Sequence, residues 1–241
     1  MPTPRLRDSS RLITHELYPL GQIPDSIIRR ISQYIVYLLA TGRTDMTGDE
    51  WGDGFAYAIA GNHLSSPLGI ADVVYGQQAW SCKTVKNNHP FNARNIRLIS
   101  GRNNVNYSYG ITDAFEDIQD TGQKVLEIWN GRVQIALDHF NPVRTIVIVR
   151  SPDLREFTIF EEQCVMYPSN QYQWEQNRNG NFIGKLGEQT YFTWQPDGSQ
   201  FTIHTKVPSN AIKFRVRKPS SIPIDDMLEL VGFEDNWVEI I

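Results

Sequence analysis

Cysteine is scarce in this chain: among 241 residues only Cys82 and Cys164 occur. Two cysteines are too few for a disulfide framework, which excludes the disulfide-stabilised secreted domains and favours a reducing, cytoplasmic setting. No run of residues approaches the roughly 18 to 20 apolar positions that a membrane-spanning helix needs. The first eight residues are basic but lack an apolar stretch behind them, so no secretory leader is expected.

Two other absences narrow the function classes. The five histidines show no metal-ligand spacing with one another or with the cysteines. No glycine-rich loop ends in Lys followed by Ser or Thr, so neither a nucleotide cofactor nor an ATP-driven activity is expected. A composition of 40% hydrophobic and 21% charged residues is ordinary for a globular protein, and the length suits one domain.

Charge is unevenly distributed along the chain, although the net charge is only −4. Residues 73–112 contain no acid but carry Lys83, Lys86, Arg94, Arg97 and Arg102. Residues 198–224 again contain no acid and carry Lys206, Lys213, Arg215, Arg217 and Lys218. Six acids without a base follow from Asp225 onward, forming an acidic tail. Such basic segments favour binding to a polyanion, and the alternative is that they are solvated loops.

The hydrophobic pattern predicts helices over 25–42, 49–61 and 112–139, the last broken near Gly131. Strands are predicted over 69–75, 79–85, 144–150, 156–166, 191–194, 200–204 and 211–216. A tight turn at Gly76-Gln77 joins the first two strands, and an Asn-rich loop covers 87–106. This order predicts an α+β (mixed α/β) fold with a β-rich carboxy-terminal portion.

The hairpin over 69–85 contains a group of residues suited to chemistry. Side chains alternate between the two faces of a strand, so Ser81 and Lys83 share one face and Cys82 points to the other. Asp72 interrupts an apolar run, where a carboxylate is costly to bury without a partner or a metal ion. Pairing through the turn would place Asp72 at the level of Ser81, so that Asp72, Ser81 and Lys83 converge.

An acid on one strand, a short turn, and a second strand bearing Ser81-Cys82-Lys83 resemble the PD-(D/E)XK nuclease superfamily. The nearest resemblance is to type II restriction endonucleases in which serine replaces the second acid, giving Ser-x-Lys. It covers residues 45–166, with Ala-Asp in place of the usual Pro-Asp. It implies an α-β-β-β-α-β core and one nuclease domain. That domain divides into an amino-terminal arm and helix (1–44), a catalytic core (45–166) and a β-rich, DNA-contacting portion with the acidic tail (167–241).

The resemblance implies hydrolysis of double-stranded DNA at a short specific sequence with Mg²⁺ as cofactor. Asp72 would hold Mg²⁺, Lys83 would orient water and stabilise the developing charge, and Ser81 would hold a water molecule. A second carboxylate is expected from the preceding predicted helix, with Glu50 favoured and Asp53 next, because they lie one turn apart. Two-fold symmetry of a palindromic site further implies a homodimer.

Asn and Arg suit bidentate contacts with adenine and guanine, so the two basic segments are the candidate DNA interface. The candidate DNA-binding residues are Lys86, Asn87, Asn88, Arg94, Arg97, Arg102, Asn103, Asn104, Lys206, Lys213, Arg215 and Arg217.

Simpler interpretations stay open for the same residues. Asp72 and Lys83 could form an ordinary salt bridge, and Glu50 and Asp53 could be solvated acids at a helix start. The functional alternatives are a repair or structure-specific nuclease of the same superfamily and a non-catalytic DNA-binding module. Cys82 is expected to be an inert, half-buried thiol rather than a nucleophile.

Overall fold

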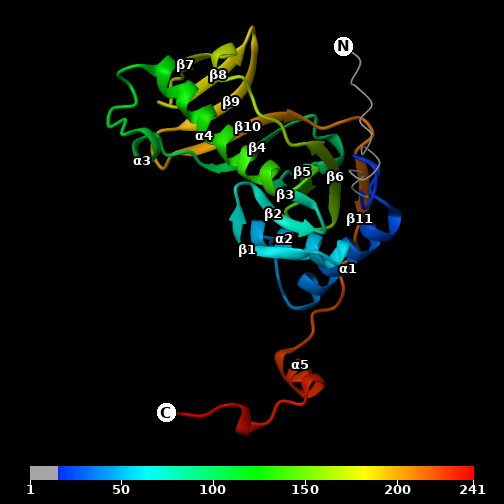
Figure 1. Cartoon of the computed structure of the whole chain (residues 1–241). Coiled ribbons are helices and arrows are strands. Elements are labelled where there is room, and N and C mark those ends of the chain that lie inside the picture. The colour runs from blue at the N-terminus through cyan, green and yellow to red at the C-terminus, as the bar shows by residue number, and fades with distance from the viewer. Residues whose placement is uncertain (1–15) are drawn as a thin grey trace, which may run out of the picture.

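The computed structural model describes residues 16–241, in which helices cover two β-sheets (Figure 1). The predicted α+β class is confirmed. Residues 1–15, which form most of the predicted arm, lie outside the described part. Among residues 16–241, no helix combines the length and the apolar character needed to cross a membrane.

The first sheet has six strands in the order β1-β2-β3-β5-β6-β11. They span Asn62–Leu68 (β1), Ala71–Tyr75 (β2), Gln78–Lys86 (β3), Val143–Arg150 (β5), Glu156–Gln163 (β6) and Ile212–Arg215 (β11). Strands β3 and β5 run parallel, and the other neighbours are antiparallel. Strand β5 is buried along its whole length, as its continuous apolar sequence predicted.

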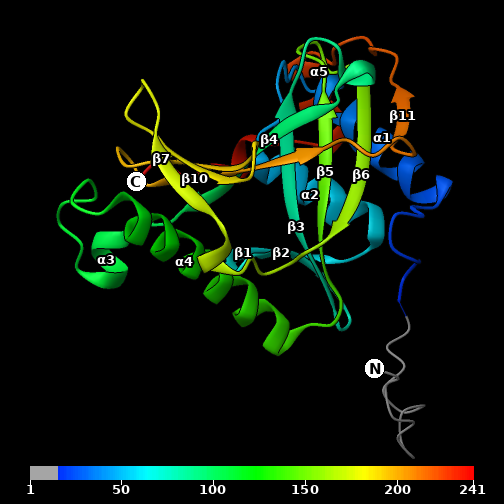
Figure 2. The ribbon, with the colours of Figure 1, turned by 90° about the horizontal axis from the view of Figure 1, so that it is seen from above.

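The second sheet has five antiparallel strands in the order β4-β10-β9-β8-β7. They span Asn95–Arg102 (β4), Gln200–Lys206 (β10), Gln189–Gln195 (β9), Phe182–Leu186 (β8) and Gln173–Gln176 (β7). Figure 2 shows β4 and β10 crossing over β3, β5 and β6. Ile96 and Leu98 of β4 pack there against Val147, Val149 and Phe160 of the first sheet.

Residues 87–106 were predicted to be a loop, but strand β4 occupies Asn95–Arg102, so the prediction is wrong for that stretch. Ile96, Leu98 and Ser100 are buried, whereas Arg97 and Ile99 between them are exposed. This is the alternation of a strand with one buried face. The polar and glycine residues around it conceal that period in the sequence.

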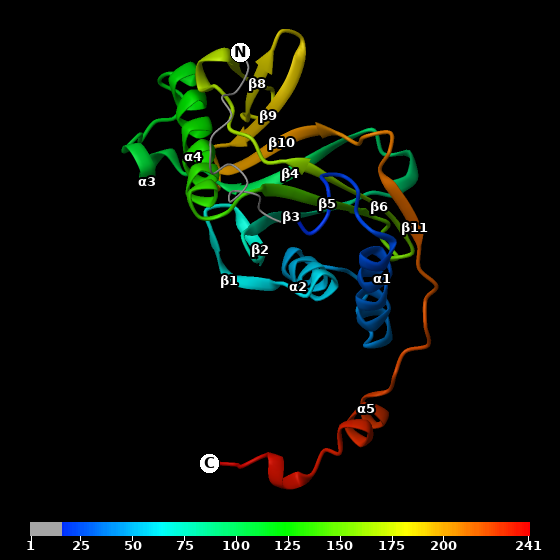
Figure 3. The ribbon, with the colours of Figure 1, turned by 45° about the vertical axis from the view of Figure 1, so that its right-hand side comes forward.

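Helices lie on both faces of the first sheet (Figure 3). Helices α1 (Asp25–Ala40) and α2 (Gly48–Ile59) cover one face, and α4 (Ile118–His139) lies with the second sheet on the other. The short helices are α3 (Val105–Tyr109) and α5 (Ile224–Val231), and 3₁₀ turns occur at Pro90–Asn92, Ser169–Gln171 and Asp235–Trp237. Because β3 and β5 are parallel, they need a crossover, and α4 lies in it.

The helices follow local signals in the sequence. Helix α1 buries one apolar stripe, made by Ile27, Ile28, Ile31, Ile35, Leu38 and Leu39. Helix α2 starts with a reciprocal capping box between Thr47 and Glu50. Helix α4 begins at Ile118, later than predicted, because the Asp117 side chain caps it. It continues through Gly131 without the predicted break.

Both the 45–166 and the 167–241 stretches contribute to both sheets. Strand β4 from the first stretch pairs with β10, and β11 from the second pairs with β6. The β-rich carboxy-terminal portion therefore exists, and its strands are interleaved with those of the predicted catalytic core.

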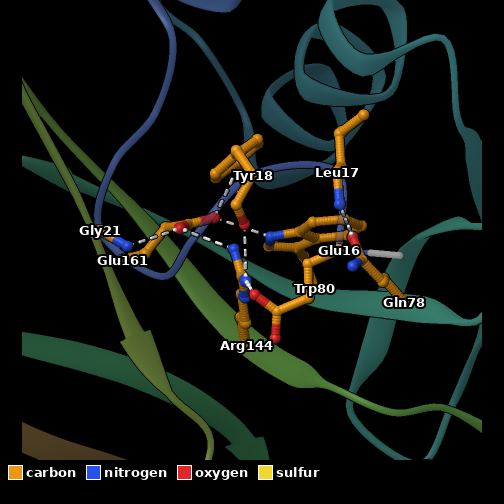
Figure 4. Close-up of polar contacts among 8 residues, drawn as sticks. All are labelled: Glu16, Leu17, Tyr18, Gly21, Gln78, Trp80, Arg144 and Glu161. Atoms are coloured by element: carbon orange, nitrogen blue, oxygen red, sulfur yellow. Dashed lines mark hydrogen bonds and ion pairs between the residues drawn. The ribbon is translucent and has the colours of Figure 1, made fainter. Parts of the chain in front are cut away.

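A buried ionic cluster fixes the chain before α1 to the first sheet (Figure 4). The Glu161 carboxylate accepts hydrogen bonds from Tyr18 Oη (2.6 Å), Trp80 Nε1 (2.8 Å) and Arg144 Nη1 (3.3 Å). Arg144 Nη2 also donates to Glu16 Oε2 at 3.0 Å. Burial, reinforced by Glu161, raises the pKa of the Tyr18 hydroxyl far above its usual range, so Tyr18 stays a donor.

Candidate active site

The β2–β3 hairpin has the register that the sequence predicted. Its turn at Gly76-Gln77 is two residues long, and Gly76 has a φ of 56°, which favours glycine. Val73 lies opposite Trp80, which places Asp72 at the level of Ser81.

Asp72 stands where β2 leaves β3. Continued pairing would bring the Cys82 amide to the backbone of Ala71, but the β2–β3 pairing ends at Val73. Ala71 keeps only its pairing with β1 on the other edge of β2. The free Cys82 amide therefore donates to Asp72 Oδ2 at 2.8 Å, and Ser81 Oγ donates to the same oxygen at 3.3 Å. The separation of the strands thus fixes the carboxylate at their junction.

Lys83 completes this constellation. Its Nζ donates to Ser81 Oγ at 2.8 Å and to the Cys82 carbonyl at 3.3 Å, and lies 3.4 Å from Asp72 Oδ2. The side chains of Asp72 and Lys83 are 21% and 17% exposed, so the pair is reachable from solvent. Ser81 is buried, and its hydroxyl bridges the two charges. The predicted convergence of the three residues is confirmed as geometry.

Cys82 faces the core under α1 and α2, as the alternation predicted. Burial raises the pKa of its thiol well above the usual range, and the Asp72 carboxylate adds to the effect. A thiol held in the protonated form is a poor nucleophile.

A cleft of about 410 Å³ opens beside this constellation, between α2 and strands β1, β2 and β3. Its walls consist of Gly48, Asp49, Asp53, His63, Leu64, Ser65, Pro67, Asp72, Cys82 and Lys83. Carboxylates of Asp49 and Asp53 from α2 therefore share one cavity with the Asp72–Lys83 pair.

Asp53 is held by a histidine on the neighbouring strand. His63 Nδ1 lies 2.8 Å from Asp53 Oδ1, and the Asp53 side chain is 55% exposed. The imidazole ring lies against Gly52, where any β-carbon would collide with it. Glycine at this helical position thus allows β1 to approach α2 and brings His63 to Asp53.

Glu50, the favoured second carboxylate, does not line the cleft. Oε2 accepts the Thr47 amide at 2.8 Å, and Oε1 lies 3.1 Å from Arg43 Nε. Its position in the first turn of α2 assigns Glu50 to capping. The structure brings Asp53, the second choice, to the cleft instead.

His63 was not predicted as a site residue, because β1 was missed. The stretch Asn62–Leu68 is polar and shows no regular alternation of burial. The only indication of this strand in the sequence was that the α-β-β-β-α-β order of the resembled core requires three successive strands, of which two were predicted. Asp49 was likewise missed, since it differs from any solvated acid at a helix start only through the cleft that folding creates.

A second cation lies near Asp72. Arg132 of α4 donates from Nη1 to the Ser100 carbonyl at 2.8 Å. Burial lowers the pKa of the Arg132 guanidinium, and the nearby Asp72 carboxylate partly offsets this. Helix α4 and strand β4 therefore contribute to the electrostatics of the site.

The two predicted basic segments meet in the second sheet, because β4 and β10 are neighbours. Arg97 pairs in register with His204, and Lys206 pairs with Asn95. The candidate DNA-binding residues that are exposed and have no side-chain partner among residues 16–241 are Asn88, Arg94, Arg97, Arg102, Lys206, Lys213 and Arg217. Burial, and to a smaller extent the charge of Arg97, lowers the pKa of His204.

The other candidate DNA-binding residues have structural contacts. Lys86 pairs with Asp45 at 2.9 Å, and Arg215 pairs with Glu156 at 2.8 Å. The Asn87 side chain accepts the His89 amide, and the Asn104 side chain accepts the Tyr107 amide at the start of α3.

Asn103 is a correction, because it is fully buried. Its side chain donates to the Val125 carbonyl at 2.8 Å, and its own carbonyl accepts from Trp194 Nε1 at 3.0 Å. It joins α4 to the second sheet and is closed to DNA.

Comparisons of the chain with protein-family models, with curated proteins and with solved structures found no match.

Proposed function

We propose that this protein is a Mg²⁺-dependent endonuclease that hydrolyses phosphodiester bonds in double-stranded DNA, of the type II restriction kind. The observation that carries the proposal is the meeting of Asp72, Ser81 and Lys83 at the separation of two strands, beside a cleft that also contains Asp53. The elements α2, β1, β2, β3, α4 and β5 follow one another in the order of the core that the sequence resembles, with β3 and β5 parallel and with β4 and α3 inserted between β3 and α4. This order supports the proposal.

The residues of the cleft fit a hydrated magnesium ion. Among residues 16–241, no cluster of three or more His, Cys, Asp or Glu could hold a metal by itself. Magnesium in phosphoryl-transfer sites commonly has one or two carboxylate ligands and completes its shell with water and substrate phosphate. Asp72 and Asp53 are the carboxylates that would hold it. When bound, the ion would neutralise phosphate charge and make water a better nucleophile.

Lys83 and Ser81 have roles that follow from their contacts. In the reaction, the water oxygen forms a bond to phosphorus and the water gives up one proton. One P–O ester bond breaks, and the leaving oxygen takes up a proton. The Lys83 ammonium, held by Ser81 and the Cys82 carbonyl, would orient the water and stabilise charge on the phosphate. Ser81, which is buried, would position Lys83 rather than contact substrate.

The second sheet supports DNA as the substrate. Arg97 and Lys206 on its strands, and Arg94 just before β4, are exposed and would contact the phosphate backbone. Arg102 at the end of β4 and Asn88 in the loop after β3 would be available for base edges. A homodimer would place one cleft at each DNA strand of a symmetric recognition sequence.

Cleavage of plasmid DNA with Mg²⁺ tests this proposal. We expect wild type to cut, and Lys83→Ala to lose about 100-fold or more of the rate while still binding DNA. Lys124→Ala is the matched control, because Lys124 pairs with Glu127 on α4 and does not line the cleft. Circular dichroism would verify that each variant folds. If wild type and Lys83→Ala are both inert on varied, unmodified DNA, the nuclease proposal fails.

One observation favours a second candidate function, a non-catalytic DNA-binding module. Asp72 and Lys83 contact each other directly, as an ordinary salt bridge would. Titration with Ca²⁺ separates the two functions: Ca²⁺ binding that disappears in Asp72→Ala favours the nuclease, and an absence of binding favours the module. Cleavage of branched DNA without any sequence rule would point to a repair nuclease instead.

A further inference from the structure

Asp53 differs from Asp72, the other carboxylate that would hold the ion, in how it is fixed. Donors of the β2–β3 hairpin fix Asp72, whereas the contact of Asp53 comes from β1, where His63 Nδ1 lies 2.8 Å from Asp53 Oδ1. An ionised carboxylate only accepts hydrogen bonds, so Nδ1 carries the hydrogen of this contact. The contact uses one carboxylate oxygen. Because the Asp53 side chain remains 55% exposed, the carboxylate can still bind a cation.

The His63 ring is itself held against α2, beside which β1 runs (Figures 1 and 3). A β-carbon at Gly52 would collide with Nε2 of the ring, and the His63 side chain is only 23% exposed. After Asp53, a β-carbon at Gly54 would collide in the same way with the Tyr34 ring of α1. A glycine inside a helix costs about 1 kcal/mol relative to alanine. These two glycines allow β1 and α1 to approach α2 closely on either side of Asp53 in the sequence.

The first sheet connects His63 to Asp72. Val73, the residue after Asp72 in β2, pairs in register with His63 of β1 and with Trp80 of β3. Residues opposite each other on paired strands point to the same face, and both Val73 and His63 pack towards α2. One row of paired residues therefore links the strand that carries Asp72 to the side chain that holds Asp53.

We propose that His63 is a positioning residue, which holds the Asp53 carboxylate in the cleft as the second ligand of the divalent ion that Asp72 binds. The inference rests on the proposed function, because it concerns the same ion. Carboxylates that bind a metal are commonly held by a hydrogen bond, and losing such a partner typically costs about 10- to 100-fold in metal affinity. Without His63, the half-exposed Asp53 side chain would be free to rotate, and binding of the ion would have to offset that freedom.

A simple surface pair between the two residues predicts a different result. An imidazole that only occupied the Asp53 carboxylate would compete with the ion for it. Removing that imidazole would leave the affinity for the ion unchanged or would raise it. The direction of the change therefore decides between the two roles of His63.

Binding of Mn²⁺ to the full chain without DNA tests the positioning role independently of catalysis. Carboxylates and water suit Mn²⁺ as they suit Mg²⁺, and the EPR signal of free Mn²⁺ measures how much ion is bound. We expect His63→Ala to weaken binding by about 10- to 100-fold. His63→Asn should retain most of the affinity, because its amide can donate from near the position of Nδ1. His139→Ala is the matched control, because His139 contacts the Ile135 carbonyl of its own helix and does not line the cleft.

Two further variants separate positioning from a general effect on the fold. Gly52→Ala keeps every ligand group but displaces the His63 ring, so it should also weaken Mn²⁺ binding. Asp53→Asn should weaken binding too, and adding His63→Ala to it should cause no further loss, because the two residues act as a unit. Additive losses would show that His63 acts through the fold, and would overturn the inference. Circular dichroism verifies that each variant folds.

The results that overturn this inference differ from those that overturn the proposed function. Mn²⁺ binding that Asp72→Asn removes, but that His63→Ala and Gly52→Ala leave unchanged or strengthen, overturns the inference and leaves the metal site in place. An absence of Mn²⁺ binding by wild type overturns both. A loss of about tenfold or more in His63→Ala that is largely absent in His63→Asn supports the positioning role.

Discussion

At the scale of single residues, Asp72 differs from an ordinary surface acid through its three donors. The Cys82 amide, the Ser81 hydroxyl and the Lys83 ammonium all converge on Oδ2 of this residue, which also lines the cleft. A carboxylate fixed in this way has little freedom left to lose when it binds a cation, which is the physical basis of a preorganised site.

His204 gives a pH prediction for stability. Burial lowers its pKa below the ordinary 6.5, and the charge of Arg97 lowers it further. Below about pH 6.5 the unfolded chain therefore binds more protons at this residue than the folded chain, so folding stability falls as pH falls. We expect wild type to lose more unfolding free energy than His204→Gln between about pH 8 and pH 5. Urea denaturation of both proteins measures it, and equal losses would contradict the assignment.

The buried Glu161–Arg144 pair gives a stability prediction. Their side chains are almost completely buried, so Glu161→Gln leaves the Arg144 charge without its buried partner. We expect a loss of about 3 to 5 kcal/mol of unfolding free energy. Glu16→Gln is the matched control, because that partner of Arg144 is 45% exposed and should cost about 1 kcal/mol or less. Similar costs for the two variants in urea denaturation would refute this account of the cluster.

At the scale of elements, two glycines of α4 have opposite surroundings. A β-carbon at Gly122 would collide with the Trp174 ring, whereas one at Gly131 would meet open space. We expect Gly122→Ala to destabilise the fold by about 1 to 3 kcal/mol through overpacking. Gly131→Ala should stabilise it by about 0.4 to 1 kcal/mol, because alanine is the better helix former. Thermal unfolding of the two variants measures both effects. Melting temperatures that change in the same direction for both would contradict the different surroundings of Gly122 and Gly131.

Elements with strong periodicity could be predicted from the sequence, and elements that depend on distant contacts could not. The apolar stripe of α1, the continuous run of β5 and the turn at Gly76-Gln77 are local signals, and each predicted its element. Strand β1 is polar, because it lies at the edge of its sheet, and it was missed.

The candidate site divides in the same way. Asp72, Ser81 and Lys83 belong to one hairpin, so strand alternation could bring them together in advance. The acid across the cleft depends on how α2 packs on β1, and sequence spacing could not choose between Glu50 and Asp53. The burial of Asn103 depends likewise on contacts with α4 and β9, which are distant in sequence.

At the scale of the whole molecule, a net charge of −4 does not oppose DNA binding, because the charges are segregated. The acids after residue 224 stand apart from the sheets, whereas Arg97 and Lys206 are exposed on neighbouring strands. In the proposed function, a polyanion would bind beside Arg97 and Lys206, away from these acids.

This arrangement predicts the salt dependence of DNA affinity. Removing one side chain that neutralises a phosphate reduces the steepness of log affinity against log salt by about 0.9. Arg97→Ala with Lys206→Ala should therefore flatten the slope, whereas Lys185→Ala, whose side chain already pairs with Glu175, should leave it unchanged. Fluorescence anisotropy at several salt concentrations measures both. An unchanged slope in the double variant would show that DNA does not bind at β4 and β10.

The most direct test of the central claim is the rate of DNA cleavage by wild type and Asp72→Asn as a function of Mg²⁺ concentration. Asparagine keeps the size of the side chain but removes the charge that would hold the ion. We predict Mg²⁺-dependent cleavage by wild type and a rate at least about 100-fold lower for Asp72→Asn at saturating Mg²⁺, with DNA binding retained. Cleavage by Asp72→Asn at the wild-type rate would contradict the assignment of this site.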